Sequence, residues 1–460
     1  MNKENYINMV FKRSQEYFYS DITKSSSYRI EQLKNLKASI EKNEKYIYAA
    51  LKEDLNKSYY ETFMSELSLV YKEINYAIRN LKDWMKPEKV KTEISQFPGC
   101  MKTYKDPYGV VLIISPWNYP FQLTMVPLIG AIAAGNCAVI KPSNYSSATS
   151  RLIMMLIHSA LPRGLATVIE GGRDENKYLL EQKFDYIFFT GSPKVGKIVM
   201  EKASKNLIPV TLELGGKSPV IITETANIKK AAKRVVFGKL LNAGQTCIAP
   251  DYILVHKSVK NELIRELINE LDNSFKSKNY YRNKYPKMIN KEHFLRIISY
   301  LQTGNTIYGG KINIDTLQIE PTIVYEPSLD SKLMQEEIFG PILPIIAYEN
   351  LDVLIEKLKR KPKSLALYLF TKDEEEKEKI IKNLSFGGGC INDTVLQISS
   401  IYGGFGGVGN SGMGRYHGKY SFDTFSHEKT ILEKSWLADN PLKYHPYNLV
   451  KFGIIKKVLN

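Results

Sequence analysis

The stretch YIFFTGSPKVGK, residues 186–197, has the pattern of a buried strand followed by a turn and a helix. Four consecutive apolar residues are typical of a strand buried on both faces. Gly191 then permits a tight turn, Ser192 is a good helix N-cap and Pro193 suits the first turn of a helix. Gly196 allows that helix to pack closely. The turn is either a capped helix start or a phosphate-binding site, because the usual G-x-G-x-x-G fingerprint is absent.

The same alternation of apolar strands and helices extends along most of the chain, after about 90 residues of helical periodicity. We expect strands at 109–115, 137–143, 167–172, 186–192 and 209–216. We expect helices between them at 121–134, 148–161, 176–181 and 193–204. A second series begins at 219–223 and runs to about 415. This pattern predicts an α/β fold with a Rossmann-like cofactor domain and a second α/β domain.

The composition argues against several classes of protein. The chain has 460 residues, 43% of them hydrophobic, and a formal charge of +16, but its lysines are scattered among glutamates without a basic stripe. We therefore expect no nucleic-acid binding. The apolar window 121–140 is broken by proline and glycine, which favours a buried helix and strand over a membrane span. The four cysteines are far apart, which argues against zinc and disulfides and indicates a cytoplasmic protein.

Cys247 stands in LNAGQTCIAP, residues 241–250, directly after a run with helical spacing. From the residues alone it could be an inert buried thiol, a redox or metal ligand, or a nucleophile. A nucleophilic cysteine reacts as the thiolate, so in that case we expect its surroundings to lower its pKa.

Seven segments in order resemble the aldehyde dehydrogenase superfamily, and specifically its class 3 or fatty-aldehyde type. They are SPWNYP (115–120), IKPSN (140–144), FTGSPKVGK (189–197), LELGGKSP (212–219), NAGQTC (242–247), EEIFGPILP (336–344) and GGVGNSGMGRYHGKYSFDTFSH (406–427). The resemblance implies oxidation of an aldehyde to its acid, with NAD or NADP as cofactor and no metal. It also implies a small β bridging domain that joins two copies into a homodimer.

The resemblance assigns three catalytic residues. Cys247 would attack the aldehyde, and the Asn118 amide would stabilise the oxyanion together with the Cys247 N–H. Glu213 would activate the water that hydrolyses the thioester. A rival enzyme that transfers its acyl group to coenzyme A usually lacks this glutamate. A cysteine hydrolase without a redox role would have little use for EEIFGP.

The resemblance also assigns the cofactor site. The expected residues are Ser115, Trp117, Lys141, Ser143, Asn144, Gly191, Ser192, Gly196, Leu214, Gly215, Glu337 and Phe339, whereas Glu336 is expected to be structural. Many family members carry a glutamate at the position of Asn144, where it repels a 2′-phosphate. A neutral side chain near Lys141 removes that repulsion, so we expect both NAD and NADP to be used.

The resemblance divides the chain into a cofactor domain (1–90 and 106–214), a catalytic domain (215–415), bridging segments (91–105 and 416–435) and a tail (436–460). We expect SFDTFSHEKTILEKS, residues 421–435, to be strand-like. The tail interleaves apolar residues with lysines at helical spacing, so it is either a solvated helix packed on a dimer or a cover over the substrate tunnel, where it could contact a membrane surface. Gln397 and SSIYGG (399–404) depart from related sequences, so the aldehyde, expected to be a medium or long aliphatic one, stays open, and an aromatic one remains an alternative.

Overall fold

The computed structural model describes residues 2–275 and 284–459. It confirms the α/β fold. A six-stranded sheet has the order β17-β7-β6-β3-β4-β5, and all of its strands are parallel except β17. The strands are β3 (Val110–Ile114), β4 (Cys137–Lys141), β5 (Ala166–Val168), β6 (Tyr186–Gly191), β7 (Val210–Leu214) and β17 (Gly412–Met413). The strand order reverses between β3 and β6, which is where dinucleotides bind in sheets of this kind.

Helices cover this sheet on both faces. Four connect its strands: α6 (Gln122–Ala134), α7 (Ser147–Ala160), α8 (Arg173–Leu180) and α9 (Pro193–Ser204). Helices α1 (Lys3–Tyr19), α2 (Ser26–Lys42), α3 (Glu44–Leu55) and α5 (Ser68–Trp84) precede the sheet. Every residue of α6 is buried, because the helix lies between the sheet and helices α2 and α5. The apolar window is therefore a core helix and strand, as the sequence predicts. No helix in the described ranges is long and apolar enough to cross a membrane.

Two boundaries differ from the prediction for a common reason. β5 ends at Val168, and α8 begins at Arg173, earlier than position 176. Gly171 has a φ of 137°, which turns the chain out of the sheet. The Gly172 N–H then bonds to Oε2 of Glu175 at 2.7 Å, and this bond caps the start of α8. A glutamate that reaches back to cap its own helix therefore replaces the last residues of the expected strand.

The second sheet has seven strands in the order β10-β13-β14-β9-β8-β15-β16, with only β10 antiparallel to its neighbour. They are β8 (Pro219–Ile222), β9 (Tyr252–His256), β10 (Asn305–Tyr308), β13 (Thr322–Tyr325), β14 (Ile342–Tyr348), β15 (Ala366–Phe370) and β16 (Gly388–Ile391). Its helices are α10 (Ile228–Leu240), α11 (Lys260–Ser274), α13 (Lys291–Leu301), α14 (Lys332–Gln335), α15 (Leu351–Lys359) and α16 (Glu374–Asn383). A short hairpin pairs β11 (Ile312–Asn313) with β12 (Gln318–Ile319).

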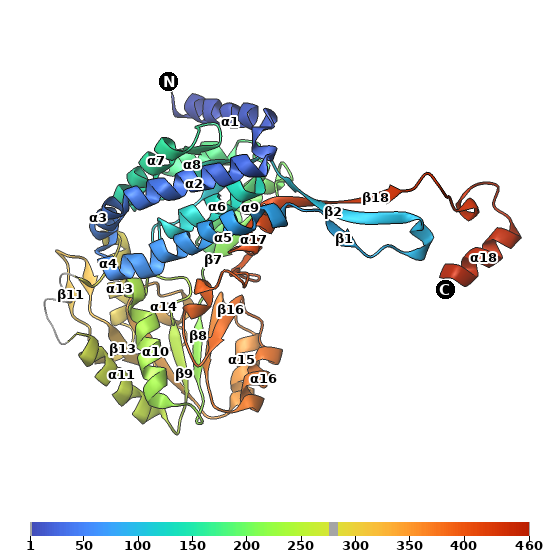
Figure 1. The fold of residues 1–460 in the computed structure, drawn as a ribbon. Helices are drawn as coiled ribbons and strands as arrows, with labels where there is room; N and C mark the ends of the chain where they lie inside the picture. Colours follow the sequence, from blue (N-terminus) through green and yellow to red (C-terminus); the bar gives the residue numbers. More distant parts are fainter. Residues whose placement is uncertain (1, 276–283, 460) are drawn as a thin grey trace.

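A three-stranded antiparallel sheet projects from the body and carries the C-terminal tail at its far end (Figure 1). It consists of β1 (Glu88–Val90), β2 (Gly99–Pro107) and β18 (Ser426–Lys434), with Ser426 opposite Pro107 and Lys434 opposite Gly99. The tail ends in helix α18 (Leu449–Leu459), which lies away from the body of its own chain (Figure 1).

The expected strand-like segment 421–435 is only partly a strand, because its first residues belong to helix α17 (Lys419–Thr424). Phe422 and Phe425, three residues apart, both pack into the core of the first sheet, and this spacing is helical. The Ser421 hydroxyl also bonds to buried Glu73 at 2.9 Å. Strand β18 begins only at Ser426.

Candidate active site

The start of α9 has the strand, turn and capped helix that the sequence predicts. Gly191 ends β6, and the Ser192 hydroxyl accepts a hydrogen bond from the Val195 N–H at 3.4 Å. A Cβ atom added at Gly196 would lie 2.6 Å from Leu214 Cδ2, so only glycine lets the helix approach β7 this closely. The turn therefore presents the N-terminus of a twelve-residue helix at the switch point of the sheet, an arrangement that suits a pyrophosphate.

Lys141 ends strand β4, which β3 separates from β6, and it is 2% exposed. Its Nζ donates to the Pro142 carbonyl at 2.8 Å, and burial lowers its pKa to about 8. Glu175 and Glu170 favour its charged form. The Ser143 hydroxyl accepts from the Tyr145 N–H at 3.2 Å. This edge therefore offers a cation and hydroxyl groups close to the phosphate-binding turn.

Asn144 follows directly and lies beside Gly172, since a Cβ added at that glycine would come within 3.9 Å of the Asn144 Nδ2. The nearest acidic neighbour of Lys141 is Glu175, whose pKa is lowered by its bond to Lys3 at 2.7 Å. A carboxylate is therefore present in the region, although not at position 144.

Aromatic side chains collect at the carboxyl end of β3. The Trp117 ring meets the Phe339 ring edge-on with centroids 5.4 Å apart, and the His293 ring lies 4.9 Å from the Trp117 ring. Phe339 has a φ of 53°, a strained backbone that turns the chain at this point. Ser115 contributes no free hydroxyl to this group, because its Oγ bonds to Thr124 Oγ1 at 2.6 Å. No motif in the sequence indicates His293.

Glu337 points toward the end of β7. A Cβ added at Gly215 would lie 2.1 Å from Glu337 Oε2, so glycine is required for the carboxylate to reach this place. Within the described residues Oε1 has no hydrogen-bond partner, and burial raises the pKa of Glu337 to about 8. By contrast, Glu336 accepts a hydrogen bond from Tyr300 at 2.6 Å, as a structural residue would. A buried acceptor without a partner suits a ligand hydroxyl, so the site fits the ribose of a dinucleotide.

A strained turn leads into Cys247. Asn242, Ala243 and Gly244 all have positive φ, at 52°, 52° and 74°. A Cβ at Gly244 would lie 2.3 Å from the Gly340 carbonyl oxygen. The Asn242 amide donates both to the Gln245 carbonyl, at 3.1 Å, and to the Asn118 carbonyl, at 2.8 Å. The turn therefore holds the residues before Cys247 against the segment that carries Asn118, and such strain is typical of functional sites.

Asn118 is buried at this junction. One N–H of its amide donates to the Gln245 carbonyl at 3.0 Å, which leaves the second N–H for another acceptor. Next to it, the Tyr119 hydroxyl bonds to the Thr246 hydroxyl at 2.6 Å. The structure thus brings Asn118 within two residues of Cys247, although the sequence separates them widely.

Glu213 lies on β7 in register with Thr190 of β6 and Gly412 of β17. It is 2% exposed, and in the described ranges neither of its carboxylate oxygens has a hydrogen-bond partner. Burial raises its pKa well above the usual range. A carboxylate left in this state is a candidate proton acceptor.

The expected lowering of the Cys247 pKa is wrong for this structure. Burial, together with the neighbouring carboxylates of Glu337 and Glu213, raises the pKa of the thiol to about 12, although the N–H groups of Cys247 and Ile248 act in the opposite sense. Three acidic groups in one buried site cannot all ionise easily, so their protonation is coupled. The NAGQTC motif predicts where the thiol lies in the sequence, but it does not predict the carboxylates that surround the thiol in the folded chain.

Comparison with known proteins identifies the family. The model of the aldehyde dehydrogenase family matches residues 2–431.

The chain belongs to the aldehyde dehydrogenase family.

The relatives of this aldehyde dehydrogenase place it in class 3. It is 48% identical to the 4,4′-diaponeurosporen-aldehyde dehydrogenase of Staphylococcus aureus, over 98% of this chain and 99% of that protein. It is 42% identical to aldehyde dehydrogenase family 3 member B1 of Mus musculus, over 94% of this chain and 93% of that protein. A structure of the substrate-bound state of Staphylococcus aureus AldH superposes with a TM-score of 0.96 and covers 99% of both chains.

A more distant structure extends the comparison to a bound cofactor. The glyceraldehyde-3-phosphate dehydrogenase GapN of Methanocaldococcus jannaschii, complexed with NADP, has a TM-score of 0.85 at 26% identity and covers 94% of this chain and 95% of that one. Members of the family use NAD or NADP. This aldehyde dehydrogenase therefore oxidises aldehydes to acids with a nicotinamide cofactor.

Sequence reasoning missed a charged pair beneath the aldehyde dehydrogenase site. Lys57, between α3 and α4 (Tyr59–Thr62), forms an ion pair with Glu66 in the π-helical turn Phe63–Leu67. Nearby Glu61 accepts the Asn242 N–H at 2.6 Å, and burial raises its pKa to about 7. These residues were interpreted only as part of a helical segment. The one available signal was the density of charges in KSYYETFMSE, residues 57–66.

Proposed function

We propose that Cys247, Asn118 and Glu213 carry the oxidation. The Cys247 thiol loses its proton to solvent, and its sulfur bonds to the aldehyde carbon as the carbonyl π bond breaks. The free N–H of the Asn118 amide together with the Cys247 N–H stabilises the resulting oxyanion. A nicotinamide cofactor, when bound, would supply the hydride acceptor. Glu213 then removes a proton from the water that attacks the thioester, and the thiol leaves with the acid as product. The observation that carries this proposal is the buried Glu213 carboxylate, which has no hydrogen-bond partner among the described residues and which raises the pKa of the Cys247 thiol.

A direct test is rapid-quench kinetics of Glu213→Gln with an aldehyde in excess. We expect one equivalent of reduced cofactor to form and turnover then to stop, because hydride loss precedes the step that needs the base. Steady turnover without a burst would contradict the role of Glu213.

We propose that the cofactor is held by the turn at Gly191, Ser192 and Gly196, and by Lys141 with Ser143. Glu337 and Gly215 would hold the nicotinamide ribose, with Ser115, Trp117, Leu214 and Phe339 around the ring. The positions of the glycines support this, because a Cβ at Gly215 or Gly196 would collide with Glu337 or Leu214.

We propose that both NAD and NADP are used, because Asn144 carries no charge. Wild-type kcat/KM values should differ by less than about a thousandfold, roughly 4 kcal/mol. Asn144→Glu should reduce kcat/KM for NADP relative to NAD by about tenfold to a hundredfold, through repulsion of the 2′-phosphate. Asn144→Gln, which adds the same length without charge, is the matched control. A wild-type preference for NAD beyond a thousandfold would contradict the proposal, and Glu175 would then be the carboxylate to examine.

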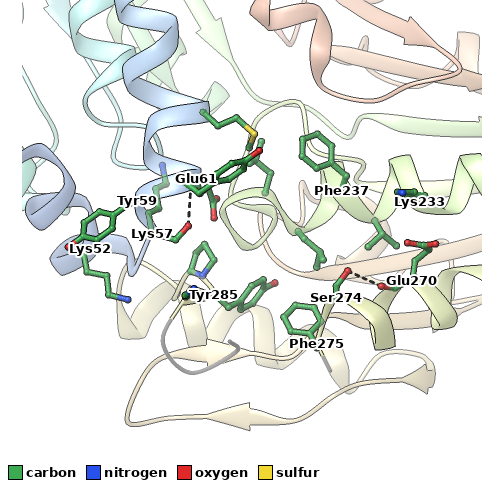
Figure 2. A pocket seen from close by; sticks show the side chains of 18 residues that line it. Lys52, Lys57, Tyr59, Glu61, Lys233, Phe237, Glu270, Ser274, Phe275 and Tyr285 are labelled. Atoms are coloured by element: carbon green, nitrogen blue, oxygen red, sulfur yellow. Dashed lines mark hydrogen bonds between the residues drawn. The ribbon is translucent and has the colours of Figure 1, made fainter. Parts of the chain in front are cut away.

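The substrate is proposed to be an apolar aldehyde of medium or long chain. A cavity of about 960 Å³ lies between α4, α10 and the end of α11, and Figure 2 shows Tyr59 and Glu61 on one side of it and Phe237 on another. Met64, Leu240 and Leu241 add to its apolar lining. The Staphylococcus aureus relative is named for diaponeurosporen-aldehyde. A panel of aliphatic and aromatic aldehydes should therefore give the highest kcat/KM for the longer aliphatic members, and a preference for short or aromatic aldehydes would contradict this.

Gln397, one of the departures from related sequences, lies on a chain of contacts that reaches the active site. Its amide bonds to the Tyr368 hydroxyl at 3.2 Å, and that hydroxyl donates to the Ile248 carbonyl at 2.5 Å, one residue after Cys247. Oε1 of Gln397 also accepts a hydrogen bond from the Cys390 thiol at 3.0 Å. We propose that Gln397 shapes the site rather than binding the aldehyde's polar end, since its own polar atoms already have partners.

The chain is proposed to be a cytoplasmic homodimer that is joined through the projecting sheet. All four cysteines are free, as a reducing compartment would leave them. Trp436, Leu437 and Phe452 are strongly exposed on the arm and tail, and a monomer rarely exposes so much apolar surface. Light scattering should give twice the mass of the chain. Deleting residues 447–460 should weaken the dimer yet leave the preference among aldehydes within about twofold; a changed preference would support the tail as a cover.

A further inference from the structure

The ion pair between Lys57 and Glu66 is the most deeply buried one near the active site. Both side chains are 0% exposed, and Lys57 Nζ lies 2.5 Å from Glu66 Oε1. The π-helical turn Phe63–Leu67 places Glu66 in this position, and such turns are frequent at functional sites. The pair belongs to none of the motifs that carry the family resemblance.

Both members of the pair bind the backbone of the segment that carries Asn118. Lys57 Nζ donates to the Asn118 carbonyl at 2.9 Å. Glu66 Oε2 accepts the N–H groups of Phe121 and Gln122 at 2.9 and 3.2 Å, where α6 begins. A carboxylate at a helix N-terminus is favourably placed for these donors. The segment 118–122 is therefore held at both ends by one ion pair.

Lys57 also contacts the neighbour of Asn118. Its Nζ lies 3.9 Å from the centre of the Tyr119 ring, whose hydroxyl bonds to Thr246, directly before Cys247. The Asn118 carbonyl receives a second hydrogen bond from Asn242 in the strained turn. The ion pair is thus linked to both sides of the place where the oxyanion would form.

Stability alone does not explain such a pair, because replacing a buried ion pair by apolar residues is often neutral or stabilising. We propose that Lys57 and Glu66 are positioning residues, which fix the backbone of residues 118–122 so that the Asn118 amide meets the oxyanion. This rests on the proposed role of Asn118. A displacement of about 1 Å in such a group can cost a hundredfold in rate.

The test is a double-mutant cycle with Lys57→Met and Asn118→Ala, measured on the full chain with one aldehyde and NAD. In the wild-type background Lys57→Met should lower kcat/KM by about tenfold to a hundredfold. In the Asn118→Ala background the same change should lower it by less than about twofold, since there is no amide left to position. Cofactor affinity, measured by fluorescence titration with reduced cofactor, should stay within about twofold of wild type.

Glu66→Gln is the second variant, because it keeps the size of the side chain and an acceptor for the Phe121 N–H. It should show the same dependence on Asn118. Arg29→Met is the matched control: Arg29 is also a buried cation that donates to backbone carbonyls, but at the other end of α6, next to Ala133. Its kcat/KM should not change at temperatures where circular dichroism shows a folded protein.

The outcomes separate this inference from the proposed function. If Asn118→Ala itself leaves kcat/KM unchanged, the oxyanion role is wrong, and the positioning role is overturned with it. If Asn118→Ala is strongly impaired but Lys57→Met and Glu66→Gln have no effect, or the same effect in both backgrounds, only the positioning role is overturned. If neither Lys57→Met nor Glu66→Gln folded, the positioning role would also be overturned, because the ion pair would then be structural.

Discussion

Glu66 and Glu213 are both buried, and their surroundings could hardly differ more. Glu66 has Lys57 on one oxygen and two backbone N–H groups on the other. Glu213 has no hydrogen-bond partner in the described part of the chain, and burial raises its pKa well above the usual range. The first carboxylate therefore has a partner on each oxygen, whereas burial disfavours the charged form of the second.

This difference separates a carboxylate that holds the fold from one that is available for chemistry. A buried acceptor without a partner costs roughly 1–3 kcal/mol of folding free energy, and such costs persist where function requires them. The neighbour of Glu213 is the Cys247 thiol, whereas the neighbour of Glu66 is a lysine. Substitution of either glutamate, or of the cysteine beside Glu213, should therefore have different consequences.

The largest effect is expected from Cys247→Ala, which removes the group beside Glu213. Turnover should fall by more than about ten-thousandfold, because no other group can form the covalent bond. Cofactor binding, followed by fluorescence titration, should remain. Cys100→Ala on strand β2 is the control and should leave kcat unchanged. Substantial activity in Cys247→Ala would contradict the assignment of the nucleophile.

The next largest effect is expected from Glu213→Gln, which changes the carboxylate that has no hydrogen-bond partner among the described residues. Steady-state kcat should fall by about a hundredfold to ten-thousandfold, since the amide cannot accept a proton from water. The matched variant Glu66→Gln should retain the deacylation step and show no burst. Bursts of equal size in both variants would erase the proposed distinction between them.

The sequence could predict the parts of the site that depend on local pattern. Ser192 caps α9 where the strand–turn–helix unit requires it, and the apolar runs form the strands of a parallel sheet. These features were predictable because strand and helix periodicity and capping chemistry act over a few residues. The family motifs likewise located Cys247 and Glu213.

The remaining features depend on contacts between distant segments. Lys57 and Asn118 are 61 residues apart, and helical periodicity gives no sign that a lysine and a glutamate will be buried together. The raised pKa of Cys247 has the same origin, because Glu337 and Glu213 reach the thiol only in the folded chain. His293 beside Trp117 is a third case. Local rules cannot reveal them because such neighbours come together only through the packing of the two sheets.

The smallest expected effects concern stability. Glu213→Gln should raise the free energy of unfolding at pH 8 by about 1–3 kcal/mol, because an amide, unlike this carboxyl, has no ionisation that burial opposes. The raised pKa of Glu213 means that its contribution to stability is present at low pH and is lost as pH rises from its unfolded value toward its folded value. The gain from the substitution should therefore shrink at pH 5. Denaturant unfolding at the two pH values measures it.

Glu66→Gln should change stability in the opposite direction, lowering the free energy of unfolding by about 3 kcal/mol at pH 8, because it leaves Lys57 buried without its counter-charge. If both substitutions shifted stability in the same direction, the two glutamates would not differ in the way their contacts indicate.

The central claim is that the Cys247 sulfur is acylated during turnover. Glu213→Gln allows the most direct measurement, because it should let the acyl group accumulate. The enzyme is mixed with an aldehyde and NAD, quenched in acid and digested, and the peptides are weighed by mass spectrometry. We expect one acyl group on the peptide that contains Cys247, and none when NAD is omitted. An unmodified Cys247 peptide after reduced cofactor has formed, or an acyl group on another residue, would contradict it.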